Sequence, residues 1–445
     1  MELYSTKNLD LRVSLKEAVF KGLPADNGLF MPVEIPQLPK HFFQQLPSMS
    51  LPEIAFEVSK TLLKGAVPQA DLKSIIEEAI SFPAPLVQLD EHKYVLELFH
   101  GPSLAFKDYG ARFMSRLMSH FNHSEDKSLV ILVATSGDTG GAVASGFYKT
   151  PGIEVVILYP SGKVSHLQEK QLTTLGHNIT ALEVDGTFDD CQALVKQAFL
   201  DQQLCKQVRL SSANSINIAR LIPQSFYYFD AYRQLNSAST PLVFSVPSGN
   251  FGNLTAGLIA QKMGLPVHQF LAATNLNDVV PEYIHTSKFN PRPSLQTISN
   301  AMDVGNPSNF VRMLDMFHVE HVGENIKGST WNNLKNAISG HAFNDESTRK
   351  GVAEVYQKFN YIIDPHGAVG YLALKEYQKI NAQSKGIILE TAHPSKFIGE
   401  VESILAKEVE IPERLASLAD KEKVATQMSI EYAPFKDWLI EKYIE

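Results

Sequence analysis

Short apolar runs that alternate with helical segments from residue 94 onward constrain the fold of this chain more than any other feature. Each run is rich in β-branched and aliphatic residues, and the segment after it repeats its apolar residues at helical spacing. Strands of this composition are typical of parallel sheets that helices cover on both faces. The predicted strands cover residues 94–98, 129–133, 153–158, 179–184, 242–246, 267–272 and 386–390. We therefore expect an α/β fold with mostly parallel sheets.

Two segments between these strands show the helical spacing clearly. In 187–200 the apolar face begins with Cys191 and continues at i+3, i+4, i+7 and i+8, so this cysteine is expected in the core. In 107–121 large apolar residues recur every four positions. Parallel sheets bind ligands at the carboxyl ends of their strands, where loops lead into helix N-termini. A functional site is therefore expected in the loops that follow the strands.

Regions of different character follow one another along the chain. Residues 1–90 mix short apolar runs with Pro clusters and are expected to form a small N-terminal module. Residues 91–400 hold the alternating strands and helices. Within them, residues 275–360 are polar and rich in Asn, which favours a helical insertion. Residues 401–445 are charged, with helical spacing, and are expected to form a helical tail.

The charge balance and the cysteine count exclude several classes of protein. The 445 residues carry 40 Lys and Arg against 48 Asp and Glu, a net charge of −8. A nucleic-acid binder or a polybasic membrane-surface protein would carry a basic stripe or cluster instead. Two cysteines are too few for a disulfide framework or a four-thiolate metal site, and no apolar run approaches the roughly 18 residues of a membrane span. We expect a cytoplasmic protein without nucleic-acid, membrane or metal partners.

The first candidate site follows the strand 94–98, where Lys107 opens a helix after a Gly-Pro turn. The apolar residues Ala105 and Phe106 precede it. Burial and the positive end of a helix both disfavour the charged form of a lysine, which lowers its pKa and suits it to Schiff-base chemistry. A solvent-exposed lysine at a helix start is the alternative explanation of this motif taken alone.

Two further loops have the composition of anion sites. Residues 134–141 follow the strand 129–133 and place small hydroxyl residues and glycines at a helix N-terminus, where backbone N–H groups can hold a carboxylate or phosphate. Residues 245–253 overlap the end of the strand 242–246, and their two glycines let the backbone wrap around a phosphate. The alternative for each loop is an ordinary helix start packed closely on its sheet.

A fourth strand end carries Thr391, whose hydroxyl could bond a ring nitrogen. A nucleophilic lysine, two anion loops and such a hydroxyl together are the parts of a pyridoxal-phosphate site. The sequence has no His-Glu-x-x-His zinc motif, Cys-x-x-Cys pair or Gly-x-Ser-x-Gly elbow. His100, His366 and His393 are either acid–base groups or histidines with a structural role.

Several motifs resemble those of the threonine synthase family, pyridoxal-phosphate enzymes of fold type II related to tryptophan synthase β. The Ser-x-x-Phe-Lys-Asp motif around Lys107 is shared with serine and threonine dehydratases, whereas residues 214–220 (NSINIAR) and 300–306 (NAMDVGN) are far more specific to threonine synthases. The similarity covers nearly the whole chain. It implies that 91–400 is a catalytic region of two lobes, with the smaller lobe at about 107–210, and that the N-terminal module resembles a class found in many bacteria and in fungi.

The resemblance also implies how each candidate residue would act on the cofactor. Lys107 would bind pyridoxal phosphate covalently and later act as general base, and Thr391 would face the pyridine nitrogen. The residues implied for the cofactor phosphate are Gly249, Asn250, Phe251, Gly252 and Asn253.

The implied substrate is O-phospho-L-homoserine, which brings a second phosphate. Its carboxylate end, or the hydroxyl side of the cofactor, would contact Thr135, Ser136, Asp138 and Thr139. Asp138 stands where many relatives carry Asn, and would pair with the substrate ammonium or cap its helix. The candidates for the substrate phosphate are Lys163 and Arg220, with Asn214 and Asn217 as further residues of the same pocket.

The implied reaction is γ-elimination of phosphate followed by addition of water at Cβ, which yields L-threonine. One alternative is a lyase like serine or threonine dehydratase, which would share Lys107 without needing a second phosphate site. Another is a binding protein without activity, which would be expected to lack the lysine or the phosphate loop. The chain is expected to act as a monomer or homodimer.

Overall fold

The larger lobe of the protein is built on a six-stranded sheet with the order β12-β11-β10-β13-β5-β4. The computed structural model describes residues 1–123, 128–235, 240–319 and 329–444. Neighbouring strands run parallel except for β4, which pairs antiparallel with β5 at the edge. The strands are β4 (Leu86–Gln88), β5 (Lys93–Glu97), β10 (Leu242–Pro247), β11 (Gln269–Thr274), β12 (Ile338–Ala342) and β13 (Lys385–Glu390).

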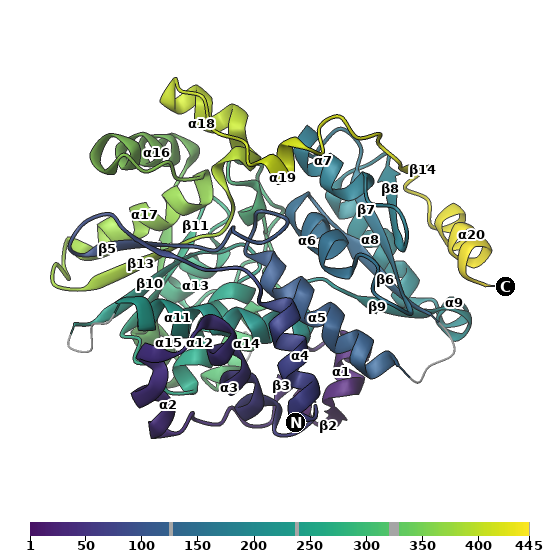
Figure 1. The fold of residues 1–445 in the computed structure, drawn as a ribbon, viewed down its shortest axis with the longest axis horizontal. Coiled ribbons are helices and arrows are strands. Elements are labelled where there is room, and N and C mark those ends of the chain that lie inside the picture. Colours follow the sequence, from purple (N-terminus) through teal and green to yellow (C-terminus); the bar gives the residue numbers. More distant parts are fainter. Residues whose placement is uncertain (124–127, 236–239, 320–328, 445) are drawn as a thin grey trace.

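The smaller lobe holds a second sheet, of five parallel strands in the order β14-β8-β7-β6-β9. Figure 1 shows the two lobes next to each other, with the N-terminal module below them. The two sheets confirm the predicted α/β class, and every strand predicted from the alternation is present. The strands are β6 (Leu129–Ala134), β7 (Ile153–Pro160), β8 (Ile179–Val184), β9 (Arg209–Ser212) and β14 (Thr426–Met428).

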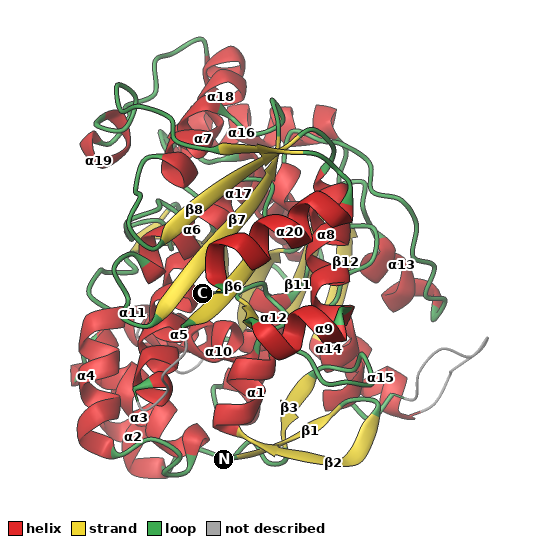
Figure 2. Cartoon of the chain, turned by 90° about the vertical axis from the view of Figure 1, so that its right-hand side faces the viewer, coloured by secondary structure: helices red, strands yellow, loops and turns green. Residues whose placement is uncertain are grey.

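Helices cover both faces of the smaller sheet, as its continuous apolar strands require. Val130 and Leu132 of β6 pack with Cys191 of α8 in one apolar cluster, while their neighbours Leu129 and Ile131 belong to the opposite cluster. Figure 2 shows α8 and α20 in front of this sheet. The core position expected for Cys191 is confirmed. The helices of this lobe are α5 (Lys107–Asn122), α6 (Asp138–Phe147), α7 (His166–Thr173), α8 (Phe188–Leu200), α9 (Gln202–Gln207) and α20 (Tyr432–Tyr443).

The larger lobe is likewise covered by helices, and several of them begin directly after strands that end at the site. The helices of the larger lobe are α10 (Ile218–Leu221), α11 (Phe226–Leu235), α12 (Gly252–Lys262), α13 (Val279–Thr286), α14 (Phe310–Met316), α15 (Ser329–Ala337), α16 (Asp345–Phe359), α17 (Pro365–Gln378), α18 (Ile398–Leu405) and α19 (Glu413–Ala416).

The N-terminal segment pairs three antiparallel strands in the order β2-β1-β3 and adds four helices. Its apolar residues share one core cluster with those of both lobes. The fully buried Arg312 of α14 fastens it further, because its guanidinium donates to the carbonyl oxygens of Phe30 and Ile216. The elements are β1 (Glu2–Ser5), β2 (Asn8–Ser14), β3 (Phe30–Pro32), α1 (Leu15–Lys21), α2 (Lys40–Gln45), α3 (Leu51–Leu63) and α4 (Gln69–Ala79).

Two segments expected to be helical also contribute strands. Residues 275–360, of which 320–328 lie outside the described residues, include β12 at the edge of the larger sheet. Residues 401–445 include β14 at the edge of the smaller sheet, and Figure 1 shows this tail crossing from the larger lobe to the smaller. Both strands are short and lie at edges, so neither carries the apolar run that marks a central strand.

Candidate active site

A cavity of about 720 Å³ lies where the two lobes meet. Residues at the carboxyl ends of four strands line it: Ala134 of β6, Pro160 of β7, Pro247 of β10 and Thr391 just after β13. This is the place at which parallel sheets bind ligands. The loops that the sequence singled out therefore converge on one volume.

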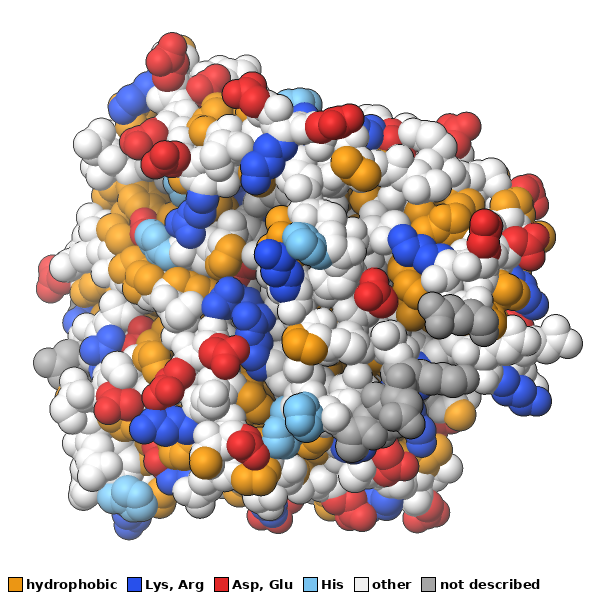
Figure 3. All heavy atoms as spheres, turned by 45° about the vertical axis from the view of Figure 1, so that its right-hand side comes forward, with side chains coloured by type: hydrophobic (Ala, Val, Ile, Leu, Met, Phe, Trp, Pro, Cys, Tyr) orange, Lys and Arg blue, Asp and Glu red, His pale blue; other side chains and the backbone are white. Residues whose placement is uncertain are grey.

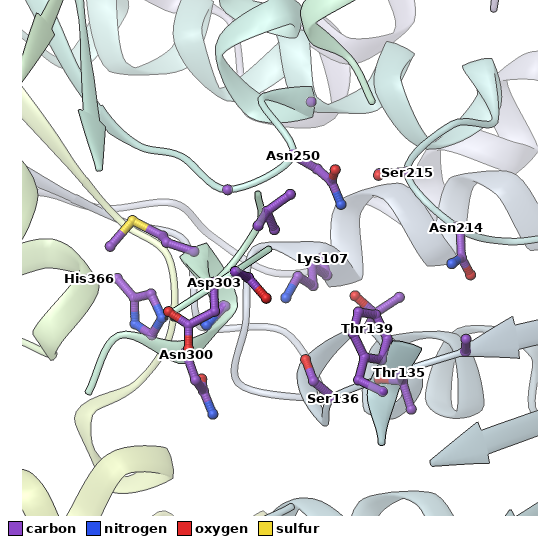
Figure 4. A pocket seen from close by; sticks show the side chains of 18 of the residues that line it. Lys107, Thr135, Ser136, Thr139, Asn214, Ser215, Asn250, Asn300, Asp303 and His366 are labelled. Carbon is purple, nitrogen blue, oxygen red and sulfur yellow. Dashed lines mark hydrogen bonds between the residues drawn. The ribbon is translucent and has the colours of Figure 1, made fainter. Parts of the chain in front are cut away.

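Lys107 is the first residue of α5 and projects into this cavity (Figure 4). Burial lowers the pKa of its amine, and the positive charges of Lys396 and Arg220 lower it further, whereas the carboxylate of Asp138 opposes them. The Nζ atom lies 3.8 Å from Oδ2 of Asp138. A buried amine in this balance is suited to act as a nucleophile and as a base.

The loop after β10 turns sharply before α12 begins. Phe251 has a φ of 59°, in the left-handed region, and caps α12, whose first backbone N–H groups point toward the cavity end of the helix. A Cβ at Gly249 would lie 2.5 Å from the carbonyl oxygen of Ala301, so only glycine fits where this loop lies against residues 301–304. Gly249, Asn250, Phe251, Gly252 and Asn253 all line the cavity.

This loop fits the phosphate of pyridoxal phosphate. The side-chain oxygen of Asn253 accepts hydrogen bonds from Tyr227 and Tyr228, which fixes the amide and leaves its buried Nδ2 without a partner among the described residues. A buried donor of this kind needs an acceptor. An anion at the N-terminus of α12 would supply it, and Lys107 and Thr391 line the same cavity for the remainder of the cofactor.

The loop after β6 lies on another wall of the cavity, as Figure 4 shows for Thr135, Ser136 and Thr139. Thr135 is held in place because its hydroxyl oxygen accepts hydrogen bonds from the backbone N–H groups of Gly137 and Gly140. The hydroxyl groups of Ser136 and Thr139 remain at the cavity surface for a ligand.

Asp138 does not cap its helix, because it is the first residue of α6 and Gly137 occupies the N-cap position. One carboxylate oxygen, Oδ1, bonds Nζ of Lys396 at 2.7 Å and Nε2 of Gln168 at 2.9 Å. Burial by itself would raise its pKa, but Lys396 and Lys107 hold that pKa well below its usual range. Asp138 is therefore a buried anion between two lysines, which the local motif could not indicate.

Of the four candidates for the substrate phosphate, three line the cavity and one does not. Lys163, Asn214 and Arg220 line the cavity, and burial lowers the pKa of Arg220 to about 10. Asn217 does not line it, because its side chain is buried on the other side of the turn. There its Nδ2 donates to the carbonyl oxygens of Val19 and Ser212, and its oxygen caps α10. The expected role of Asn217 in the pocket is replaced by a structural one.

The histidines also divide. His366 lines the cavity, with Nδ1 2.6 Å from Oδ2 of Asp364 and Nε2 accepting from the backbone N–H of Ala301. Both ring nitrogens are thus occupied, Nδ1 by Asp364 and Nε2 by the loop that faces Gly249. Burial lowers the pKa of His393 to about 4, and its ring caps the turn Pro394–Phe397.

Further cavity residues were not anticipated from the sequence: Ser215, Gln224, Ser294, Gln296, Asn300 and Asp303. Lys396, which lies five residues after Thr391 and close to the same strand end, was also missed. Asn300 and Asp303 belong to the segment 300–306 and Ser215 belongs to the segment 214–220, and the family resemblance of these segments was the signal that could have marked them. Gln224 lies in the turn Ile222–Ser225, and Ser294 and Gln296 lie in a loop without a local signature, so the fold alone brings these three residues to the site.

Charges elsewhere are mixed. Acidic and basic side chains are interspersed over the face drawn in Figure 3. Among the described residues, no helix is long and apolar enough to cross a membrane.

Comparison with known proteins covers the chain from end to end. The family model for pyridoxal-phosphate dependent enzymes matches residues 80–390, and models for the threonine synthase N terminus and C-terminal region match residues 2–80 and 367–437. Threonine synthase from Escherichia coli is 42% identical over 437 residues, which cover 98% of each chain. Threonine synthase from Haemophilus influenzae is 43% identical, over 99% of this chain and 100% of the relative.

Solved structures agree with these matches. The crystal structure of threonine synthase from Brucella melitensis with bound pyridoxal phosphate superposes with a TM-score of 0.94 and 34% identity, over 100% of this chain and 99% of the other. The two terminal models are specific to threonine synthases, so they decide against the dehydratase-like alternative. The chain belongs to the threonine synthase family of pyridoxal-phosphate-dependent enzymes.

Proposed function

We propose that this chain converts O-phospho-L-homoserine and water into L-threonine and phosphate, with pyridoxal phosphate bound at Lys107. The observation that carries the proposal is the position of Lys107 in a cavity that is also lined by residues 249–253 and by the polar side chains of Lys163, Asn214 and Arg220. Residues 249–253 serve the phosphate of the cofactor. Lys163, Asn214 and Arg220 serve the phosphate of the substrate.

The reaction needs a base at the α-carbon of the substrate. Bound pyridoxal phosphate withdraws electrons from that carbon and makes its proton acidic. Burial lowers the pKa of the Lys107 amine and makes its neutral form more accessible, and this form can take the proton and later return one. Overall, the bond between Cγ and the phosphate oxygen breaks and one C–H bond of Cβ breaks, while Cγ gains a proton and Cβ forms a bond with the oxygen of water. One proton of water stays on the new hydroxyl group and the other leaves with the phosphate.

Arg220 supports the assignment of a phosphorylated substrate. Its guanidinium is almost fully buried, and Nη1 donates to the carbonyl oxygen of Ala213 at 2.5 Å. Its Nε has no acceptor among the described residues. A buried cation that lacks a full set of partners is costly, and a bound dianion would compensate its charge.

We further propose that the protein acts in the cytoplasm, as a monomer or homodimer. Cys191 and Cys205 are both free thiols, which fits a reducing compartment. The net charge of −8 fits a small-molecule enzyme without a nucleic-acid partner.

The test is a product assay on the purified protein with added pyridoxal phosphate. O-phospho-L-homoserine, L-threonine and L-serine are offered in parallel, and phosphate, threonine and 2-oxo acids are quantified. Equal amounts of phosphate and threonine from the first substrate are expected. Production of 2-oxobutanoate from L-threonine, without release of phosphate from O-phospho-L-homoserine, would contradict the proposal.

A further inference from the structure

Lys396 is a buried lysine with partners in the opposite lobe. It lies in the turn Pro394–Phe397, directly after β13 of the larger sheet, and its side chain is only 1% exposed. Its Nζ bonds Oδ1 of Asp138, at the start of α6 in the smaller lobe, and donates to the carbonyl oxygen of Ser103 at 2.8 Å. A lysine this deeply buried needs such partners, because an uncompensated ammonium would lose its charge.

The two oxygens of the Asp138 carboxylate lie near different groups. Lys396 and Gln168 occupy Oδ1, at 2.7 and 2.9 Å. The other oxygen, Oδ2, lies 3.8 Å from Nζ of Lys107. The contacts at Oδ1 fix the plane of the carboxylate, so they also fix where Oδ2 lies relative to the amine of Lys107.

We propose that Lys396 is a positioning residue, which clamps Oδ1 of Asp138 from the opposite lobe so that Oδ2 faces the amine of Lys107 as a shared partner. An undivided ion pair with Asp138 would hold Lys107 as an ammonium, which is neither a nucleophile nor a base. Sharing the carboxylate with Lys396 weakens that hold while keeping the carboxylate ionised. The inference rests on the proposed function in one respect, that Lys107 is the reacting amine.

The charges around Lys107 determine whether removing a neighbouring charge raises or lowers its pKa. The groups that face it are Asp138 from α6, Lys396 from the turn after β13 and Arg220 from α10, and Asp108 follows it in α5. Burial lowers the pKa of Lys107 most, Asp138 raises it, and Lys396 and Arg220 lower it. Removing the charge of Asp138 therefore lowers this pKa, and removing the charge of Lys396 raises it.

The test measures the titration of Lys107 directly, in the full chain after removal of the cofactor. Competitive labelling of amines with acetic anhydride at a series of pH values, with quantification by mass spectrometry, gives the rate at Lys107. For Asp138→Asn the pKa of Lys107 should fall by about one unit, which makes labelling below the pKa about tenfold faster. For Lys396→Met it should rise by about one unit, with labelling about tenfold slower.

Three further variants keep the test falsifiable. Lys396→Arg retains the charge and should label Lys107 as the unchanged protein does. The double variant Asp138→Asn with Lys396→Met removes both charges and should return the pKa of Lys107 toward its original value. It can be measured even if one of the single variants folds poorly. Lys375→Met, which removes a lysine paired with Glu354 at the surface, is the matched control. Circular dichroism verifies the fold of each.

Opposite shifts in Asp138→Asn and Lys396→Met would support the proposal. An unchanged or lowered pKa of Lys107 in Lys396→Met, or equal shifts in Lys396→Arg and Lys396→Met, would overturn it. The labelling does not depend on the product formed, so a failure of the proposed function would appear in the product assay alone and leave these shifts intact.

Discussion

Gly249→Ala tests whether the loop after β10 is fitted to the cofactor phosphate. The added Cβ would lie 2.5 Å from the carbonyl oxygen of Ala301, 3.0 Å from Cα of Met302 and 3.2 Å from Cγ2 of Val304. Gly249 is not among the residues with positive φ, so the cost is steric rather than conformational. Carbon atoms pack best at about 3.5–4.0 Å, so one of the two loops must retreat by about 1 Å.

Forcing a methyl group into a packed site costs about 1–3 kcal/mol. If the loops are displaced from the positions that hold the phosphate, the Kd for pyridoxal phosphate rises about 5- to 150-fold. Titration of the cofactor-free protein, followed by its fluorescence, measures this Kd. The control is Gly399→Ala, because a Cβ there meets no heavy atom within 4 Å. A Kd for Gly249→Ala equal to that of the control would show that the loop after β10 is not fitted to the cofactor phosphate.

Three other changes have defined outcomes. Lys107→Ala should abolish turnover and leave the thermal midpoint of unfolding unchanged. Borohydride reduction should fix the cofactor to the unchanged protein only, and peptide mapping should locate it on Lys107. Burial raises the pKa of Asp108 to about 6, above its unfolded value near 3.9, so its protonated form stabilises the fold at low pH and this stability is lost as the pH rises through 6. Asp108→Asn should remove about 2 kcal/mol of the change in unfolding free energy between pH 4 and pH 7, measured with urea at each pH. Arg312→Met should lower the free energy of unfolding by about 3–5 kcal/mol, because it removes the guanidinium that donates to the buried carbonyl of Phe30 and the half-buried carbonyl of Ile216; a loss below 1 kcal/mol would contradict this.

Patterns along the sequence were sufficient for the central strands and for the loops at their ends. The run 129–133 is apolar throughout and the run 242–246 is apolar except for Ser245, because both faces of each strand are buried, and such runs are visible without a structure. The glycine loop after β10 and Lys107 at a helix start are likewise local features. These are the residues at which sequence and structure agree.

The remaining residues depend on contacts between distant parts of the chain. Lys396 and Asp138 are 258 positions apart, and no spacing rule connects them (396 − 138 = 258). Asn217 and Arg220 are three positions apart in one motif. Nevertheless, Arg220 lines the cavity, whereas the side chain of Asn217 lies away from it and donates to the carbonyl oxygen of Val19. The edge strand β14 has three residues, too few for any periodicity. Only the folded chain assigns these roles.

In the proposed reaction, phosphate leaves from Cγ of O-phospho-L-homoserine and water enters at Cβ. The most direct test is turnover in oxygen-18 water, with mass spectrometry of both products. Cleavage between carbon and oxygen predicts one labelled oxygen in the hydroxyl group of each threonine and none in the released phosphate. Label in the phosphate, with homoserine as the other product, would reveal hydrolysis of the phosphate ester and contradict the account.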